Sequence, residues 1–307
     1  MTDENQPGDG DTTESVPKID EIVQHPGQTR PCLVFLSGAR LGEIIPIDRP
    51  ILVGRDASCE LRIVDDDGIS RRHFQLLPQG DQVLLQDLGS HNGTFVGDQT
   101  MTEALLEHGD KIRVGQTTVL RFCVYDRVEE EAQRNLLESA LRDPLTRAFN
   151  RRYFHQRLLS EMRFALRPGQ PVGLIVLDID HFKAINDQHG HLVGDEVLQR
   201  LALLVQSKLR AEDVLARFGG EEFAVIVRGT PLRGCEVLAE RLRRAAEEAI
   251  FSFGAATVRL SISVGLALFP WEGATITTPP DELIVRADQA LYSAKQGGRN
   301  RVSVQPT

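Results

Sequence analysis

The order of hydrophobic and polar positions divides the 307-residue chain into segments of different character. Residues 1–29 are rich in Asp, Glu, Gly, Pro and Thr. Such a segment buries too little apolar surface to offset its ordering entropy, so we predict a disordered acidic tail. Residues 30–126 contain short apolar runs that alternate with Gly- and Asp-containing turns, a pattern typical of a β-sandwich.

The second half of the chain has helical and mixed patterns. Residues 127–142 predict a linker helix, because apolar residues recur there at four-residue steps. These residues are Val128, Ala132, Leu136 and Ala140, with Leu137 and Leu141 beside them. The helix either packs on one of the domains or forms half of a two-stranded coiled coil. In residues 143–307 apolar, strand-like runs alternate with amphipathic stretches, which predicts an α+β domain around a central sheet.

Composition and charge narrow the classes of function. The net charge of -9 argues against nonspecific nucleic-acid binding, which needs a basic surface. No apolar run is long enough to span a bilayer, and the polar, acidic N-terminus does not match a secretory signal. We therefore expect a cytoplasmic protein with no membrane and no nucleic-acid partner. Four scattered cysteines are interpreted as reduced core residues: Cys32, Cys59, Cys123 and Cys235.

The sequence Gly-Gly-Glu-Glu-Phe at 219–223 is the strongest chemical signal in the chain. It lies between apolar runs at 214–218 and 223–227, which predicts a hairpin with the glycines at its tip. Two adjacent acids repel each other unless a cation lies nearby, and glycine lets a nucleotide approach the backbone. Upstream, the apolar run 172–177 predicts a buried strand that ends in acids at 178–180, where α/β-type sheets place ligands.

These motifs, in this order, resemble the GGDEF family of diguanylate cyclases. The resemblance covers about residues 140–305 and rests on the following segments: Asp178-x-Asp180-x-Phe182-Lys183-x-x-Asn186-Asp187, Gly190-His191-x-x-Gly194-Asp195, Gly219 to Phe223, and Lys295 with Gly298-Arg299-Asn300. It implies a ferredoxin-like catalytic core that condenses two GTP molecules into cyclic di-GMP and two pyrophosphates. It also implies a homodimer and two Mg²⁺ or Mn²⁺ ions per active site.

The resemblance assigns roles position by position. The expected metal ligands are Asp178, the Ile179 carbonyl and Glu221. The expected catalytic residues are Glu221, Glu222 and Lys183. The expected GTP-binding residues are Phe182, Asn186, Asp195, Lys295 and Arg299, of which Asn186 and Asp195 would recognise guanine. Asp180 is expected to be structural, and Asp143 is expected to form an ion pair with Arg151.

An Arg-x-x-Asp sequence, Arg210 to Asp213, is separated from Gly219 by five residues. It resembles the inhibitory site at which members of the family bind their product, because arginine can stack on guanine and aspartate can accept its N–H groups. Arg241 would supply a second arginine to that site. An ordinary surface ion pair is the alternative interpretation of the same residues.

Three segments of the β region resemble a forkhead-associated (FHA) domain: Gly54-Arg55, Ser70-Arg71-Arg72-His73 and Ser90-His91-Asn92-Gly93-Thr94. A dianionic phosphate needs guanidinium and hydroxyl donors at fixed positions. The resemblance implies a phosphothreonine site built from Arg55, Ser70, Arg71, His91 and Asn92, with His73 and Gly93 holding the loops.

Thr12 and Thr13 have acidic neighbours and resemble the self-binding tail of some bacterial FHA regulators, so the chain's own phosphorylated tail is one expected ligand. A merely solubilising tail is the alternative. For the whole chain two other functions remain open. One is a non-catalytic phosphoprotein-binding scaffold that senses cyclic di-GMP, and the other is a different nucleotide cyclase on a related fold.

Overall fold

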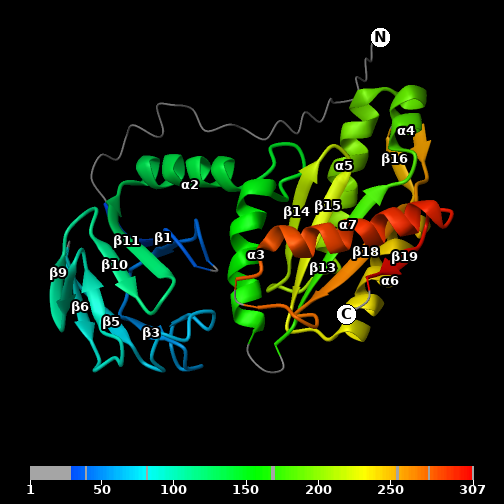
Figure 1. Ribbon diagram of the computed structural model, residues 1–307. Helices are drawn as coiled ribbons and strands as arrows, with labels where there is room; N and C mark the ends of the chain where they lie inside the picture. Colours follow the sequence, from blue (N-terminus) through cyan, green and yellow to red (C-terminus); the bar gives the residue numbers. More distant parts are fainter. Residues whose placement is uncertain are drawn as a thin grey trace, which may run out of the picture.

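The structure is a computed structural model that describes residues 29–38, 40–80, 82–166, 170–253, 256–275 and 277–305 (Figure 1). Residues 1–28 of the predicted tail, with Thr12 and Thr13, lie outside these residues. In the part of the chain that the structure describes, no helix combines the length and the apolar character needed to cross a bilayer.

The N-terminal β region is a sandwich of two sheets, as predicted. One sheet has the strand order β2-β1-β11-β10-β7-β8, and the other has the order β4-β3-β5-β6-β9. Their strands are β1 (Arg30–Phe35), β2 (Ile44–Pro46), β3 (Ile51–Gly54), β4 (Leu61–Arg62), β5 (Phe74–Gln79), β6 (Gln82–Asp87), β7 (Thr94–Val96), β8 (Gln99–Met101), β9 (Glu103–Leu106), β10 (Lys111–Val114) and β11 (Thr118–Tyr125). Alternate residues point inward and form a core that includes Phe35, Phe74 and Phe122.

Helix α2 (Arg127–Leu141) follows the sandwich and begins at a capping box. Asp126 accepts a hydrogen bond from the Glu129 amide, and the Glu129 carboxylate accepts one from the Asp126 amide. The predicted apolar stripe of this helix is exposed to solvent. Leu137 instead packs against the outer face of the β1–β11 sheet, and Leu141 packs against the C-terminal core. The helix therefore contacts both domains through residues adjacent to the stripe.

The C-terminal unit is built on a mixed sheet with the order β12-β14-β15-β13-β18-β19. Its elements are β12 (Phe149–Asn150), α3 (Arg151–Ala165), β13 (Val172–Ile179), α4 (Phe182–His189), α5 (His191–Gln206), β14 (Val214–Gly219), β15 (Glu222–Arg228), α6 (Leu232–Glu248), β18 (Ile262–Phe269), α7 (Pro280–Gln296) and β19 (Val302–Val304). A separate ribbon pairs β16 (Phe251–Phe253) with β17 (Ala256–Val258). The four central strands β14-β15-β13-β18 are antiparallel and have the strand order of a ferredoxin-like fold.

Helices cover both faces of this sheet. The core on one face is formed with α3 and α7, of which α7 crosses in front of the sheet in Figure 1, and the core on the other face is formed with α5 and α6. Strand β13 lies between β15 and β18, and all eight of its residues are buried. Because β13 is covered on both faces, its run of apolar residues is continuous rather than alternating. The carboxylate of Asp178 is thus held at the end of the most buried strand.

Candidate functional site

The Gly-Gly turn forms the tip of the β14–β15 hairpin, as predicted. Gly220 has φ of 50°, a left-handed conformation that glycine adopts at little cost. The guanidinium of Arg217 donates to the Gly220 carbonyl oxygen from Nε at 3.0 Å and from Nη2 at 2.8 Å. Its Nη1 lies 3.1 Å from Oδ1 of Asp143. The tip is therefore fixed to the segment that follows the linker helix.

The expected partner of Asp143 was wrong. Asp143 pairs with Arg217, whereas the guanidinium of Arg151 lies 5.2 Å from the centre of the Phe218 ring. Asp143 also accepts hydrogen bonds from the amide and the hydroxyl of Thr146. Burial alone would raise the pKa of Asp143, but these hydrogen bonds and Arg217 hold it below its usual value. The carboxylate is therefore ionised at neutral pH.

Acidic residues of two neighbouring strands lie beside this tip. Asp178 of β13 is the direct cross-strand neighbour of Glu222 on β15, and Glu221 precedes Glu222. Lys295, from the last turn of α7, places Nζ 2.8 Å from Asp178 Oδ2. Burial raises the pKa of Asp178, Lys295 lowers it, and Glu221 and Glu222 add a further rise. The site thus contains three acidic residues, and the charge of one of them, Asp178, is offset by Lys295.

Asp180 is structural, as expected. Its carboxylate accepts hydrogen bonds from the hydroxyls of Ser261 and Ser263 and from the Asn300 amide. These bonds connect the end of β13 to β18 and to the turn after α7. They hold Lys295 and the left-handed residue Arg299 (φ 63°) at the corner where β13 ends.

The acids fit a hard divalent cation that a substrate helps to bind. Among the described residues no group of three or more His, Cys, Asp or Glu side chains is arranged so that it could hold a metal ion by itself. Mg²⁺ commonly uses one or two carboxylates together with phosphate oxygens. Asp178 and Glu221, with the Ile179 carbonyl at the end of β13, are the expected members of a sparse oxygen set of this kind.

The expected guanine-binding residues are brought together by α4 and α5. Gly194 is buried in α5, and a Cβ at this position would lie 1.9 Å from the side-chain oxygen of Asn186. Gly194 therefore leaves the space that the Asn186 side chain occupies. Asp195 follows Gly194 and is exposed, as is Lys183 on the first turn of α4, whereas Phe182 is buried beneath them.

The Arg-x-x-Asp segment is not a simple surface ion pair. Asp213 is buried, and its Oδ2 accepts a hydrogen bond from the backbone N–H of Arg210 at 3.0 Å. The Arg210 side chain is exposed. Arg241, on α6, donates to the carbonyl oxygen of Lys208 at 2.6 Å, which brings it beside the Arg210 segment. An open groove of about 660 Å³, lined by Lys208 and Arg241 among others, lies there.

The five expected phosphopeptide residues lie on three neighbouring loops of the sandwich. Arg55 Nε donates to the Ile69 carbonyl at 2.5 Å, and Asn92 Nδ2 donates to the Gly68 carbonyl at 2.8 Å. The Ser70 hydroxyl accepts a hydrogen bond from the His91 amide at 3.0 Å. The loops are thus interlocked, with Arg71 and His91 exposed beside them.

Buried His73 holds these loops, as the sequence predicted. Its Nδ1 accepts from the Ser70 amide at 3.0 Å, and its Nε2 lies 3.2 Å from the Gly93 carbonyl. Asp67 is not among the predicted site residues, but its Oδ1 lies 3.7 Å from Nη1 of Arg55. An acid already contacts the arginine that is expected to bind phosphate.

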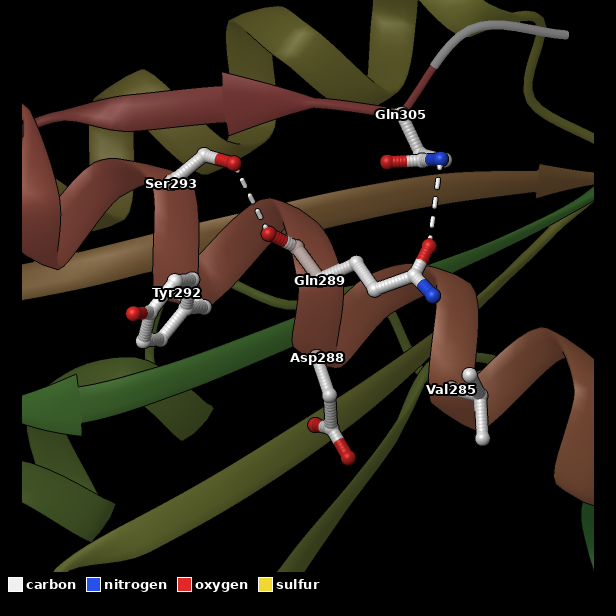
Figure 2. Close-up of a pocket in the computed structure, with 6 residues that line it drawn as sticks. All are labelled: Val285, Asp288, Gln289, Tyr292, Ser293 and Gln305. Carbon is white, nitrogen blue, oxygen red and sulfur yellow. Dashed lines mark hydrogen bonds between the residues drawn. The ribbon is translucent and has the colours of Figure 1, made fainter.

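A second groove, of about 580 Å³, lies on the outer face of α7 (Figure 2). In it the Gln305 amide donates to the Gln289 side chain, and the Ser293 hydroxyl donates to the Gln289 carbonyl. Asp288 is the one charged residue in its lining. A triphosphate needs cations, so this groove does not match a nucleotide site.

Comparison with known proteins agrees with this geometry. The family model "Diguanylate cyclase, GGDEF domain" matches residues 140–301, which is more than half of the chain, and the FHA domain model matches residues 51–115. The chain belongs to the GGDEF family. Its order of domains is an FHA domain followed by a GGDEF domain, as the motifs indicated.

Relatives of the GGDEF domain have been named in several bacteria. The chain is 43% identical over 167 residues to diguanylate cyclase DgcP of Pseudomonas aeruginosa, which covers 54% of this chain and 24% of that protein. It is 42% identical over 168 residues to response regulator PleD of Caulobacter vibrioides, which covers 54% of this chain and 36% of that protein. The chain thus spans about a quarter to a third of the length of these relatives.

A solved structure shares the fold of the catalytic half. The coiled coil and GGDEF domain of DgcB from Caulobacter crescentus, in complex with c-di-GMP, matches with a TM-score of 0.52 and 30% identity, over 57% of this chain and 91% of that one. Diguanylate cyclase SiaD from Pseudomonas aeruginosa, in complex with its activator SiaC, matches with a TM-score of 0.51 and 34% identity, over 58% of this chain and 66% of that one.

Proposed function

We propose that this chain is a diguanylate cyclase that condenses two GTP molecules into cyclic di-GMP and two pyrophosphates, and that its FHA domain reads a phosphothreonine. The observation that carries the proposal is the cross-strand pairing of Asp178 with Glu222, next to Glu221, together with the contact of Lys295 with Asp178 beside a glycine hairpin tip. The family to which the chain belongs, and relatives named as diguanylate cyclases, support it.

The reaction joins the 3′-hydroxyl of each GTP to the α-phosphate of the other and releases pyrophosphate. Two divalent cations, Mg²⁺ or Mn²⁺, would neutralise phosphate charge and favour ionisation of the attacking hydroxyl. Asp178, Glu221 and the Ile179 carbonyl would hold them, and Glu222 would assist the hydroxyl. Lys183, Lys295 and Arg299 would bind the triphosphate. Lys295, which contacts Asp178 in this structure, would then leave Asp178 and contact phosphate oxygens.

Guanine recognition falls to Asn186 and Asp195, with Phe182 forming the wall of the pocket. A carboxylate accepts from the N1–H and N2–H groups of guanine together, and adenine has no such pair of donors. Each half-site holds one GTP, and the two α-phosphates must each face the other nucleotide's hydroxyl. Catalysis therefore requires a homodimer, at least during turnover.

The proposal includes two forms of regulation. Cyclic di-GMP would bind at Arg210, Asp213 and Arg241, of which Arg241 lines the groove beside α6, and would inhibit the enzyme. A phosphothreonine peptide, or the chain's own tail phosphorylated at Thr12 or Thr13, would bind at Arg55, Ser70, Arg71, His91 and Asn92. The phosphate would displace Asp67 from Arg55.

The test is incubation of the full chain with GTP and Mg²⁺, followed by identification of the product by mass spectrometry. We expect cyclic di-GMP, and we expect Glu221→Gln to lower its formation by about a hundredfold or more because a metal ligand is lost. The control Glu272→Gln removes the same charge from an exposed position and should retain activity. Binding of cyclic di-GMP with no turnover of GTP would favour the scaffold instead, and another cyclic product would favour a different cyclase.

A further inference from the structure

The FHA and GGDEF domains meet at a row of alternating charges. Asp65 of the FHA domain forms an ion pair with Arg228, the last residue of β15. Arg228 Nε lies 3.2 Å from Glu161 Oε2 on α3, and Arg157 Nη2 lies 2.8 Å from Glu161 Oε1. The side chains of Arg228 and Asp65 are 13% and 18% exposed, so this contact is largely removed from solvent. Without Asp65 the row would carry an excess positive charge.

The Arg228 side chain is further held inside its own domain. Its guanidinium lies 3.9 Å from the centre of the Phe164 ring. Burial lowers the pKa of Arg228, and burial raises that of Glu161 against the opposing effect of Arg157. An arginine remains protonated at neutral pH despite such a shift, so Arg228 presents a fixed positive charge to the FHA domain.

Three consecutive aspartates of one FHA loop face three different partners. Asp65 pairs with Arg228 of the other domain, and Asp67 lies 3.7 Å from Arg55 of the expected phosphate site. Between them Asp66 is buried, and its carboxylate accepts hydrogen bonds from six donor groups. Four are the backbone amides of Gly68, Gln116, Thr117 and Thr118, and two are the hydroxyls of Thr117 and Thr118. The loop is thereby held against the sandwich at its centre, and its two flanking acids point to different sites.

The same loop supplies part of the phosphate site. The Gly68 carbonyl accepts from Asn92, and Ser70 bonds to the His91 amide. A Cβ on Gly68 would lie 2.7 Å from the Gly115 Cα, so the loop is packed closely on its neighbour. A second, apolar contact holds the domains together, because Leu41 of the FHA domain packs against the C-terminal core and Gly42 leaves room for Leu141.

We propose that Arg228 of the GGDEF domain supports phosphopeptide binding by the FHA domain, so that the phosphopeptide and the docked arrangement of the two domains stabilise each other. This inference rests on the proposed phosphothreonine function of the FHA domain. It adds that the binding site depends on a residue of the other domain. It also states the direction of the effect: docking of the two domains strengthens peptide binding.

The charge of Arg228 and the ordering of the loop on docking both favour stronger peptide binding in the docked state. Asp65 and Asp67 are two residues apart, so their Cα atoms lie within about 7 Å of each other. When the domains are docked, Arg228 offsets one of the acids that a dianionic phosphate must approach. A positive charge about 15 Å from a dianion changes its affinity about threefold in a high-dielectric medium, and less at high salt. Docking also fixes Asp65, which orders the loop before the peptide arrives and adds to the effect.

Reciprocity follows from linkage. If docking strengthens peptide binding, the peptide must strengthen docking by the same factor. Arg228 is at the opposite end of β15 from the Gly-Gly tip, about 20 Å away for a strand of this length. The Asp65 contact therefore lies at the sheet end remote from the nucleotide site, whereas the Leu41 contact involves Leu141, two residues before Asp143.

The first experiment measures hydrogen exchange in the full chain with and without a synthetic peptide of residues 6–18 that carries phosphothreonine at position 12 or 13. In the native chain the peptide should slow exchange in its own loops and also, remotely, at the end of α3 and of β15. Asp65→Asn should abolish the remote protection and speed exchange of residues 63–70 without peptide. The control Asp98→Asn removes an exposed acid between β7 and β8, at the sheet edge farthest from β2, and should retain both effects.

The second experiment measures the dissociation constant of the same peptides at low ionic strength. Arg228→Gln should weaken binding about threefold or more, and the effect should shrink at high salt. Arg163→Gln, an exposed arginine of α3, is the charge-matched control. Because Arg228→Gln also affects buried Glu161, Asp65→Asn is the variant that leaves the catalytic core intact.

The outcomes separate this inference from the proposed function. Peptide binding that depends on Arg55 but is equal in native, Arg228→Gln and Asp65→Asn chains would overturn the inference and leave the phosphothreonine function standing. Failure of both peptides to bind the native chain would overturn the inference together with tail recognition. Unchanged exchange of residues 63–70 in Asp65→Asn would overturn it without any peptide.

Discussion

Arg217 holds the carbonyl oxygen of Gly220 with two hydrogen bonds, 3.0 and 2.8 Å long, from a single guanidinium group. The third nitrogen of that group faces Asp143, two residues beyond the end of α2. A planar fork with several donors can serve both partners at once. The position of Glu221, which follows Gly220, therefore depends on a residue that is not expected to touch substrate.

Replacement of Arg217 by lysine tests this dependence. Lysine keeps a positive charge near Asp143 but cannot hold the Gly220 carbonyl in the same fork. Because a small displacement of a catalytic group is costly, we expect kcat to fall about tenfold to a hundredfold with little change in KM for GTP. Steady-state kinetics check this, with exposed Arg152→Lys as the control and thermal unfolding to confirm the fold. Equal turnover in Arg217→Lys would contradict it.

Gly194→Ala should impair substrate binding without weakening its helix. Alanine favours a helix interior by about 1 kcal/mol over glycine. Its Cβ, however, would lie 1.9 Å from the side-chain oxygen of Asn186, which must move. We expect KM for GTP to rise about tenfold, the size of a lost base contact. In the double variant with Asn186→Ala the two effects should not add, since both act on one side chain. Full additivity would argue against the proposed contact.

Asp66 should make the FHA domain sensitive to acid. Burial alone would raise its pKa, but the hydrogen bonds from Gln116, Thr117 and Gly68 outweigh burial and lower it. A carboxyl group with a lowered folded-state pKa stabilises the fold fully above its unfolded pKa of about 3.9, and this stability is lost as pH falls through the folded value.

Asp66→Asn should therefore cost about 2–4 kcal/mol of unfolding free energy at pH 7, because an amide group offers fewer acceptors to these donors. The cost should shrink toward pH 3. Urea denaturation of both proteins across that range measures it. A cost that is constant with pH would show that the charge is not responsible.

Lys295 should set the acid limit of activity. Burial raises the pKa of Asp178 and Lys295 opposes the rise, so Lys295→Met should raise that pKa further. Asp178 must be ionised to bind a cation, and activity falls as pH drops through its pKa. The acid limb of the kcat/KM profile should therefore move to higher pH in Lys295→Met.

Lys183→Met provides the matched comparison for this experiment. It removes a lysine that is also expected to meet the triphosphate, but Lys183 is exposed and is not paired with Asp178. Activity should fall in both variants, and the acid limb should move only in Lys295→Met. A shift of equal size in Lys183→Met would assign the limb to phosphate binding instead.

The sequence predicted those parts of the molecule in which local pattern and final environment agree. The strand ending at Asp178 and the hairpin at Gly220 follow from continuous apolar runs that stop at turn residues, and both are present. The loops with Arg55 and Ser70 were identifiable because their motifs have fixed spacing. Arg217 stands two residues before the Gly-Gly pair, and this position was the available signal for its role.

The features that the sequence did not predict depend on contacts between distant parts of the chain. Asp143 and Arg217 are 74 positions apart and meet because β12 pairs with β14 in parallel. Asp65 and Arg228 meet only once both domains have folded. On α2 the four-residue spacing predicts an apolar stripe, but the stripe is exposed and Leu137 and Leu141 beside it make the contacts of the helix. Periodicity identifies an apolar stripe without identifying what covers it.

Strand β15 has the Gly-Gly tip at one end and Arg228 at the other, and it is hydrogen-bonded along its length to β13 and β14. A strand held on both sides cannot slide or bend independently, so a force applied at Arg228 moves the whole sheet as a rigid body. A signal that enters at Arg228 is therefore suited to changing the position of the catalytic domain and its approach to a second copy, and poorly suited to altering the shape of the nucleotide pocket itself.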